Sequence, residues 1–234
     1  MKPLRRLLKK VVAKSTGGQS LRTLSSVSAY ALWAESYPPH AHNLLMQTEE
    51  ATMQAMMPSL DEQYVLDLAC GSGRYSRIAI DSNAKQVIGV DNSFDMLNMG
   101  QDAFKRHSRP QFVLGTTESI SLKSNTVDVV LCGLALGHLP NLKPSLHEIN
   151  RVLKQGGIAL VSDFHPFLFL NGKQRTFTAS NGDVFAVEHY PHLYSDYTQA
   201  VHAVGLTIEN VQEPQIDIDG VQVPAVIVYR LRKD

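Results

Sequence analysis

Three things are scarce in this chain of 234 residues, and each absence excludes a class of protein. Only two cysteines occur, Cys70 and Cys132, and they lack the spacing of a metal site, which argues against a disulfide scaffold or a zinc module. No apolar run reaches the ~20 residues of a membrane-spanning helix. The formal net charge is +0, so no overall field attracts nucleic acid, and no nucleic-acid partner is expected. The length suits one α/β domain, and two buried, reduced thiols favour a cytoplasmic location.

The amino terminus departs from this even composition. Residues 1–22 are rich in lysine and arginine, and no acidic residue comes before Glu35. Apolar residues between the basic ones recur at helical spacing, which predicts a basic amphipathic helix ahead of a domain at residues 23–234. Peripheral membrane contact through residues 1–14 and a transit-like segment are two interpretations. We favour the alternative of a solvated helix that packs on its own domain or on a second subunit of a homodimer, or a frayed tail.

The most informative pattern begins at residue 64. A short apolar run that ends on Asp67 is followed by Gly71-Ser72-Gly73, a segment of helical pattern, and a second apolar run that ends on Asp91. Strand, glycine turn, helix, strand and acid, in this order, indicate a nucleotide-like cofactor at the carboxyl ends of parallel strands. The two glycines let the backbone pass close under a ligand. Asp91 can accept hydrogen bonds from both hydroxyls of a ribose.

Two details favour a cationic cofactor over a dinucleotide. A dinucleotide fingerprint places a third glycine where this chain has Ser76. Asp67 would repel a pyrophosphate, whereas it suits the sulfonium and ammonium groups of S-adenosylmethionine. A nicotinamide-dependent oxidoreductase remains the alternative interpretation of this pattern.

The run Val65-Leu66-Asp67-Leu68-Ala69-Cys70-Gly71-Ser72-Gly73 resembles the glycine-rich first motif of class I S-adenosylmethionine-dependent methyltransferases. Val90–Leu97 resembles that family's second motif. Three later segments continue the resemblance, namely Gln111–Glu118, Val127–Leu139 and Lys154–Asp163. The chain departs from the family pattern at Thr116, where relatives have an acid, and at Gln155, where they have a proline. Within this family, the chain is similar to the small-molecule branch, which includes the ubiquinone/menaquinone C-methyltransferases and the malonyl-carrier-protein O-methyltransferases.

The resemblance implies a Rossmann-like α/β fold with a seven-stranded, mostly parallel sheet whose last strand is antiparallel. A helical cap is expected at residues 23–60, and Asn181-Gly182 predicts a hairpin within a lid insertion at residues 164–192. A helix over Leu193–Val204 and two strands, Leu206–Gln212 and Val221–Leu231, are expected to close the domain. The residues expected to contact the cofactor are Tyr30, Asp67, Ala69, Cys70, Gly71, Gly73, Asp91, Asn92, Met96, Thr117, Glu118 and Cys132.

The implied activity is methyl transfer from S-adenosylmethionine to a small organic acceptor, by O- or C-methylation, with an apolar, quinone-like or acyl-carrier-linked substrate. His138 and His165 follow the fourth and fifth expected parallel strands and are the candidate catalytic bases. Both also suit a structural role, and a carboxylate acceptor needs no base. His189 and His192 lack a third ligand, so no metal is expected. A relative that binds the cofactor without turning it over is a further alternative.

Overall fold

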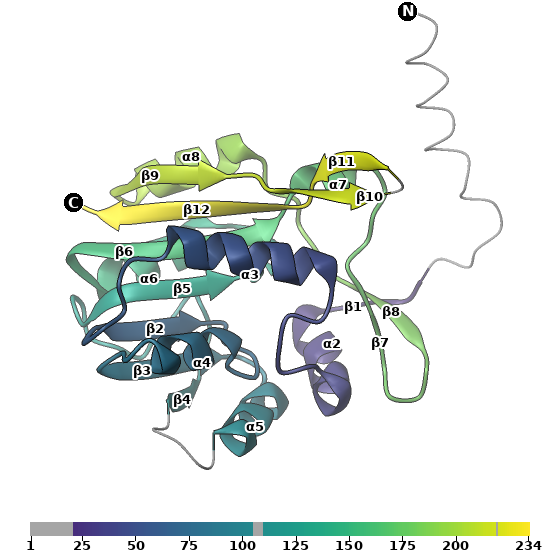
Figure 1. The fold of residues 1–234 in the computed structure, drawn as a ribbon, viewed down its shortest axis with the longest axis horizontal. Coiled ribbons are helices and arrows are strands. Elements are labelled where there is room, and N and C mark those ends of the chain that lie inside the picture. The colour runs from purple at the N-terminus through teal and green to yellow at the C-terminus, as the bar shows by residue number, and fades with distance from the viewer. Residues whose placement is uncertain (1–20, 105–109, 219) are drawn as a thin grey trace, which may run out of the picture.

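A central sheet of seven strands organises the molecule (Figure 1). The computed structural model describes residues 21–104, 110–218 and 220–234, so all but the last two residues of the expected basic segment 1–22 lie outside the described residues. The strands follow the order β4-β3-β2-β5-β6-β12-β9. Their bounds are β2 Tyr64–Leu68, β3 Gln86–Asp91, β4 Gln111–Leu114, β5 Val127–Gly133, β6 Leu153–Phe164, β9 Leu206–Gln212 and β12 Val226–Lys233.

The direction of the strands confirms the expected topology. Strands β2 to β6 pair in parallel, and β12 pairs antiparallel with both β6 and β9. The inner strands are apolar on both faces because helices cover both sides of the sheet. Val65 and Leu66, adjacent on β2, are both fully buried although they point to opposite faces. The sheet is therefore the middle layer of a three-layer fold.

Helices on the two faces build two separate apolar cores. Helices α6 (Lys143–Val152) and α8 (Tyr194–Ala203) pack on one face, together with Leu66. Helices α3 (Leu44–Met56) and α4 (Arg74–Asp81) pack on the other, together with Val65. Helix α5 (Phe94–Ala103) lies against β3 and β4 near the sheet edge (Figure 1). Among the described residues, no helix is both long enough and apolar enough to cross a bilayer.

Residues 23–36, the first part of the segment that we call the cap (23–60), pack against residues 164–192, which we call the lid. The cap begins with β1 (Thr23–Leu24), α2 (Ser26–Trp33) and the 3₁₀ turn η1 (Ala34–Ser36). The lid contains α7 (Pro166–Leu170) and an antiparallel hairpin, β7 (Thr176–Thr178) and β8 (Val184–Val187), which confirms the hairpin predicted around Asn181-Gly182. Strand β1 adds to β8 in parallel, a pairing that the sequence did not predict. The two segments also share a small apolar core that includes Ala29 and Phe177.

The carboxyl-terminal strands differ from the expectation in one respect. The expected strand over 221–231 is divided into β11 (Val221–Pro224), which pairs with β10 (Gln215–Ile218), and β12. The break falls at Ala225, whose amide donates to Pro214 and whose carbonyl accepts from His165. Pro224 has no amide hydrogen, which favours leaving the ladder at this point. The remaining short element, η2 (Leu136–His138), follows β5 at the edge of the cavity described below.

A buried carboxylate attaches the cap helix α3 to the sheet. Glu49 is fully buried and accepts hydrogen bonds from Arg74 (2.8 Å), Tyr75 (2.7 Å) and Ser162. A buried carboxylate requires such partners because it has lost its hydration. Gly133 lies alongside, where a Cβ would be 2.4 Å from the Tyr75 ring. The network therefore fixes α3, α4 and the ends of β5 and β6 together.

We predict that Glu49→Ala lowers the free energy of unfolding by about 3 kcal/mol, because it leaves Arg74 and the buried Tyr75 and Ser162 without their common acceptor. The neighbouring Glu50, which also binds Arg74 but is partly exposed, provides the control, and Glu50→Ala should cost less than about 1 kcal/mol. Urea denaturation of both variants makes the comparison. Equal losses would contradict the central role of Glu49.

Candidate active site

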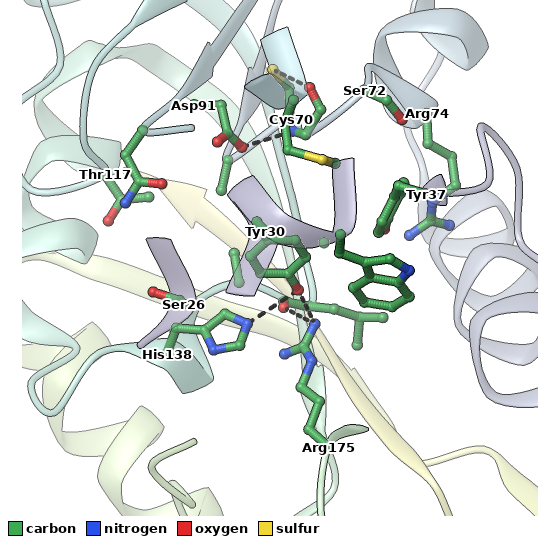
Figure 2. A pocket seen from close by; sticks show the side chains of 18 of the residues that line it. Ser26, Tyr30, Tyr37, Cys70, Ser72, Arg74, Asp91, Thr117, His138 and Arg175 are labelled. Atoms are coloured by element: carbon green, nitrogen blue, oxygen red, sulfur yellow. Dashed lines mark hydrogen bonds between the residues drawn. The ribbon is translucent and has the colours of Figure 1, made fainter. Parts of the chain in front are cut away.

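A cavity of about 490 Å³ opens at the carboxyl ends of β2, β3, β5 and β6, beneath the cap and the lid (Figure 2). This volume lies in the range of small-molecule sites, and the position is the usual one for ligands of parallel sheets. One end is formed by the loops that follow β2, β3 and β4. The other end is formed by aromatic side chains of the cap and by the segment that precedes β7.

Asp91 ties together the two loops at the first end. It is the last residue of β3, its Oδ2 accepts from the Gly71 amide at 2.8 Å, and its Oδ1 accepts from the Ser93 amide at 2.8 Å (Figure 2). Burial raises the pKa of this carboxyl, while the hydrogen bonds from Ser93 and Gly71 oppose the rise. Each oxygen keeps a second lone pair, so the carboxylate can still accept from a pair of vicinal hydroxyls.

The turn after β2 needs unusual backbone angles. Ala69 and Gly71 have φ of +56° and +54°, and both line the cavity. A Cβ on Gly71 would come within 3.1 Å of Met96 Cε, so a glycine here keeps the wall close without displacing Met96. Gly73, at φ +87°, instead caps α4, and a Cβ there would lie 2.8 Å from the Phe104 ring. Gly73 thus serves packing, and it is not among the residues that line the cavity.

Asp67 is the second acidic residue of this end. It is buried, it lines the cavity, and its Oδ2 accepts from both the amide and the hydroxyl of Ser76, each at 2.7 Å. Ser76, the residue that departs from the dinucleotide fingerprint, is therefore the partner of Asp67. Burial raises the pKa of Asp67, and the two hydrogen bonds from Ser76 lower it. Burial has the larger effect, and the resulting pKa is about 7.

The remaining side chains predicted at this end also reach the cavity. Asn92, Met96, Thr117 and Glu118 line it, as does Cys70. The Thr117 hydroxyl shares a 2.7 Å hydrogen bond with Ser145, which orients it. The Ser72 hydroxyl is buried on the cavity wall and has no hydrogen-bond partner among the described residues.

Aromatic rings form the opposite wall. Tyr30 stacks on Trp33 with ring centroids 6.0 Å apart, and Trp33 packs edge-on against Tyr37 at 4.8 Å. Trp33 also stacks on Phe177 of the lid at 5.0 Å, which connects this wall to the hairpin. Electron-rich faces of this kind attract cations and bury apolar groups.

The Tyr30 hydroxyl is the centre of a polar network (Figure 2). It lies 3.3 Å from His138 Nε2 and accepts from Arg175 Nη2 at 3.0 Å. His138 Nδ1 is 2.8 Å from the carbonyl of Glu188 and must donate to it, so Nε2 is the acceptor for Tyr30. Burial, followed by the charge of Arg175, lowers the pKa of His138 well below its usual range. This imidazole is therefore neutral.

Three predicted site residues lie outside the lining of the cavity. Gly73 packs on Phe104, and Cys132 is fully buried within β5. His165 caps α7, with Nδ1 accepting from the Phe167 amide at 3.2 Å and Nε2 3.1 Å from Glu213. Sequence reasoning missed two charged lining residues, Arg74 and Arg175. Only Arg74 carried a usable signal, because it directly follows the glycine turn.

Solved structures share this architecture. An S-adenosylmethionine-dependent methyltransferase of Mesorhizobium loti matches with a TM-score of 0.67 at 20% identity, over 79% of this chain and 97% of its own. One described as putative, from Listeria monocytogenes, matches with a TM-score of 0.66 at 23% identity, over 80% and 99%. At these identities the likeness concerns the fold.

Sequence comparison matches the central part of the chain to a family model. Residues 66–161, from β2 through most of β6, match the family described as a methyltransferase domain. This segment is similar to methyltransferase domains, and the chain as a whole has the fold of the class I methyltransferases. This match confirms the resemblance carried by the Asp67–Gly73 motif.

The curated methyltransferases that it matches are aligned over only part of their length. A demethylmenaquinone methyltransferase of Staphylococcus carnosus is 36% identical over 98 residues, which are 41% of this chain and 40% of that protein. A malonyl-[acyl-carrier protein] O-methyltransferase of Hamiltonella defensa is 26% identical over 152 residues, 65% of this chain and 57% of that protein. In each case the match covers less than two thirds of the relative.

We predict that the stability of this protein falls as pH rises toward 7. The pKa of Asp67 is raised from 3.8 to about 7. Between these two pH values the folded state therefore holds a proton that the unfolded state has lost. The stability that this proton contributes is complete below pH 4 and is lost as pH rises through 7. Between pH 5 and pH 8, the free energy of unfolding of the wild type should fall by about 2 kcal/mol more than that of Asp67→Asn.

Urea denaturation of the ligand-free protein at both pH values measures this difference. Asp163, whose pKa is also raised by burial, to about 6, titrates in both proteins and cancels in the comparison. Parallel pH dependences of the wild type and Asp67→Asn would contradict the prediction.

Proposed function

We propose that this protein binds S-adenosylmethionine at the Asp67–Asp91 end of the cavity and transfers the methyl group to a small organic acceptor held under the cap and the lid. The observation that carries the proposal is the pair of buried carboxylates, Asp67 and Asp91, on either side of a tight glycine turn in one cavity. Anions there favour a cationic ligand and disfavour a phosphate-bearing one.

The donor set fits the cofactor group by group. Asp91 would take the ribose hydroxyls, and Asn92, Met96 and Thr117 would surround the adenine. The turn at Ala69–Gly71, with Asp67 beneath it, would face the charged amino-acid end. The unpartnered Ser72 hydroxyl supplies a further polar contact on the same wall. When bound, the sulfonium supplies an electrophilic methyl group with its leaving group already attached.

The task left to the protein is alignment and exclusion of water. The aromatic wall of Tyr30, Trp33 and Tyr37 suits both purposes, because it is apolar, fixed by stacking, and joined to the lid. We assign His138 a positioning role, since its Nε2 already accepts from Tyr30 and its neutral form is enforced by burial. A catalytic role of His165 stays a prediction, and its contacts with Phe167 and Glu213 suit a structural one.

The oxidoreductase alternative has less support. After β6 the chain continues into the antiparallel pair β12 and β9, where a dinucleotide fold would add further parallel strands. Ser76 holds the Asp67 carboxylate at the position of the third glycine, so a negative charge lies where a pyrophosphate would be bound. We further propose a cytoplasmic site of action, in keeping with the two free, buried cysteines.

Calorimetric titration tests the cofactor assignment. We predict that purified protein binds S-adenosylhomocysteine and does not bind NAD, and that Asp91→Ala lowers the affinity at least tenfold because two hydroxyl contacts are lost. Asp95→Ala, at an exposed position four residues along, is the matched control and should bind like the wild type. Preference for NAD, or equal affinities of Asp91→Ala and the wild type, would overturn the proposal.

The affinity for S-adenosylmethionine should depend on pH through Asp67. Because the pKa of this carboxyl is raised to about 7, most of it is protonated at pH 6 and most of it is ionised at pH 7.5. We predict that the affinity rises roughly fivefold over this interval, and that Asp67→Asn binds more weakly with no such rise. Titrations in matched buffers measure both constants. A rise of the same size in Asp67→Asn would show that another group is responsible.

A further inference from the structure

Arg175 is a cation with unused hydrogen-bonding capacity at the acceptor end of the cavity. It precedes β7, lines the cavity, and places its guanidinium 4.5 Å from the centre of the Phe164 ring. Its Nη2 donates to Tyr30 Oη at 3.0 Å and to the Leu134 carbonyl at 2.8 Å. Its Nη1 is buried and has no hydrogen-bond partner among the described residues. A buried guanidinium nitrogen without a partner is unfavourable in the ligand-free protein and indicates that a ligand supplies one.

The second arginine on the cavity wall shows the contrast. Arg74 is paired with Glu49 at 2.8 Å and with Glu50 at 3.0 Å, so two carboxylates neutralise its charge. Arg175 forms no such ion pair with any of the described carboxylates, and both of its recorded acceptors are neutral oxygens. The acceptor end of the cavity therefore carries a positive charge without a direct ion pair, and the buried Asp163 carboxyl interacts with this charge only at longer range.

Within the part of the chain that the structure describes, no side chain of this region is placed to remove a proton from an acceptor. His138 is neutral and already engaged by Tyr30. The pKa of His189, behind the wall next to His138, is lowered to about 4 by burial and by the charge of Arg175. Asp163 is buried, accepts from Tyr197 and Phe164, and does not line the cavity. An acceptor that arrives already deprotonated fits these surroundings best.

We propose that the acceptor is a small carboxylic acid with an apolar body, bound as its carboxylate by Nη1 of Arg175 against the wall of Tyr30, Trp33 and Tyr37. This rests on the proposed function. One carboxylate oxygen forms a bond to the methyl carbon while the carbon–sulfur bond breaks and its electron pair stays on sulfur. The products are a methyl ester and the neutral thioether S-adenosylhomocysteine, and no proton is transferred. Arg175 holds the second oxygen and directs the first toward the cofactor end.

The sole tryptophan of the chain, Trp33, lies in the wall and reports on occupancy through its emission. Protein saturated with S-adenosylhomocysteine is titrated with phenylacetate and hexanoate, and with their uncharged amides. Arg175→Gln removes the cation, Arg175→Lys keeps the charge but changes the donor geometry, and the exposed Arg22→Gln is the matched control. S-adenosylhomocysteine affinity is measured for every variant and verifies that each is folded.

We expect the acids to bind roughly tenfold or more tightly than their amides in the wild type and in Arg22→Gln. Arg175→Gln should lose this preference while its S-adenosylhomocysteine affinity stays within about twofold, and Arg175→Lys should fall between the two. With labelled S-adenosylmethionine, the product should be a base-labile methyl ester.

The outcomes separate the two proposals. Failure of the wild type to bind S-adenosylhomocysteine overturns the proposed function. Normal S-adenosylhomocysteine binding with no preference for acids, with no binding of either acid, or with the preference intact in Arg175→Gln overturns the carboxylate assignment alone. If Arg175→Gln does not fold, the same judgement is made on Arg175→Lys, where an undiminished preference contradicts the role of the guanidinium.

Discussion

The Glu49 carboxylate is the contact on which the shape of the site depends. It lies in the cap helix α3, yet its partners Arg74, Tyr75 and Ser162 belong to α4 and β6. No water is needed to satisfy it, and the absence of a Cβ at Gly133 makes room for it beside Tyr75. Because a buried charge is tolerated only with all of its partners in place, α3 has a single favourable position over the sheet. That position defines one side of the cavity.

The carboxylates of Asp67 and Asp91 on the cavity wall differ from that of Glu49 in the groups that donate hydrogen bonds to them. Asp67 and Asp91 receive hydrogen bonds from neutral backbone amides and a hydroxyl, and no described cation forms an ion pair with either of them. Burial therefore raises both of their pKa values. A ligand that brings positive charge and hydroxyl donors relieves this unfavourable burial, so part of the affinity for a cation is already built into the ligand-free fold.

Local pattern was enough to predict the sheet and to name most of the residues that line one end of the cavity. Buried parallel strands are apolar runs, the turn at Gly71 needs a positive φ, and the two acids lie at or next to the last residues of their strands. These features depend on neighbours in sequence. Gly73 shows the limit of such a prediction. The sequence does not distinguish a glycine that faces a ligand from one that, like Gly73 at φ +87°, faces the Phe104 ring.

The acceptor end depends on contacts between distant residues, and sequence reasoning named Tyr30 and His138 there but missed Arg175 for that reason. Tyr30 and Arg175 are separated by 145 positions, and nothing in the residues around Arg175 distinguishes it from a solvated arginine next to a hairpin. The burial of Glu49 was equally hard to predict, since an acid on an amphipathic helix is normally exposed. The pairing of β1 with β8 adds only two residues of ladder, too short a signal to find in the sequence.

These long-range contacts also connect recognition to enclosure. Strand β1, the Trp33–Phe177 stack and the Tyr30–Arg175 hydrogen bond all join the cap to the lid, and the last of these lies on the cavity wall. An anion at Arg175 would therefore bind to a side chain that already joins the lid to the cap. Binding of the acceptor would stabilise the contact between the cap and the lid that separates the methyl group from water. Recognition of charge and exclusion of solvent would then both act through Arg175.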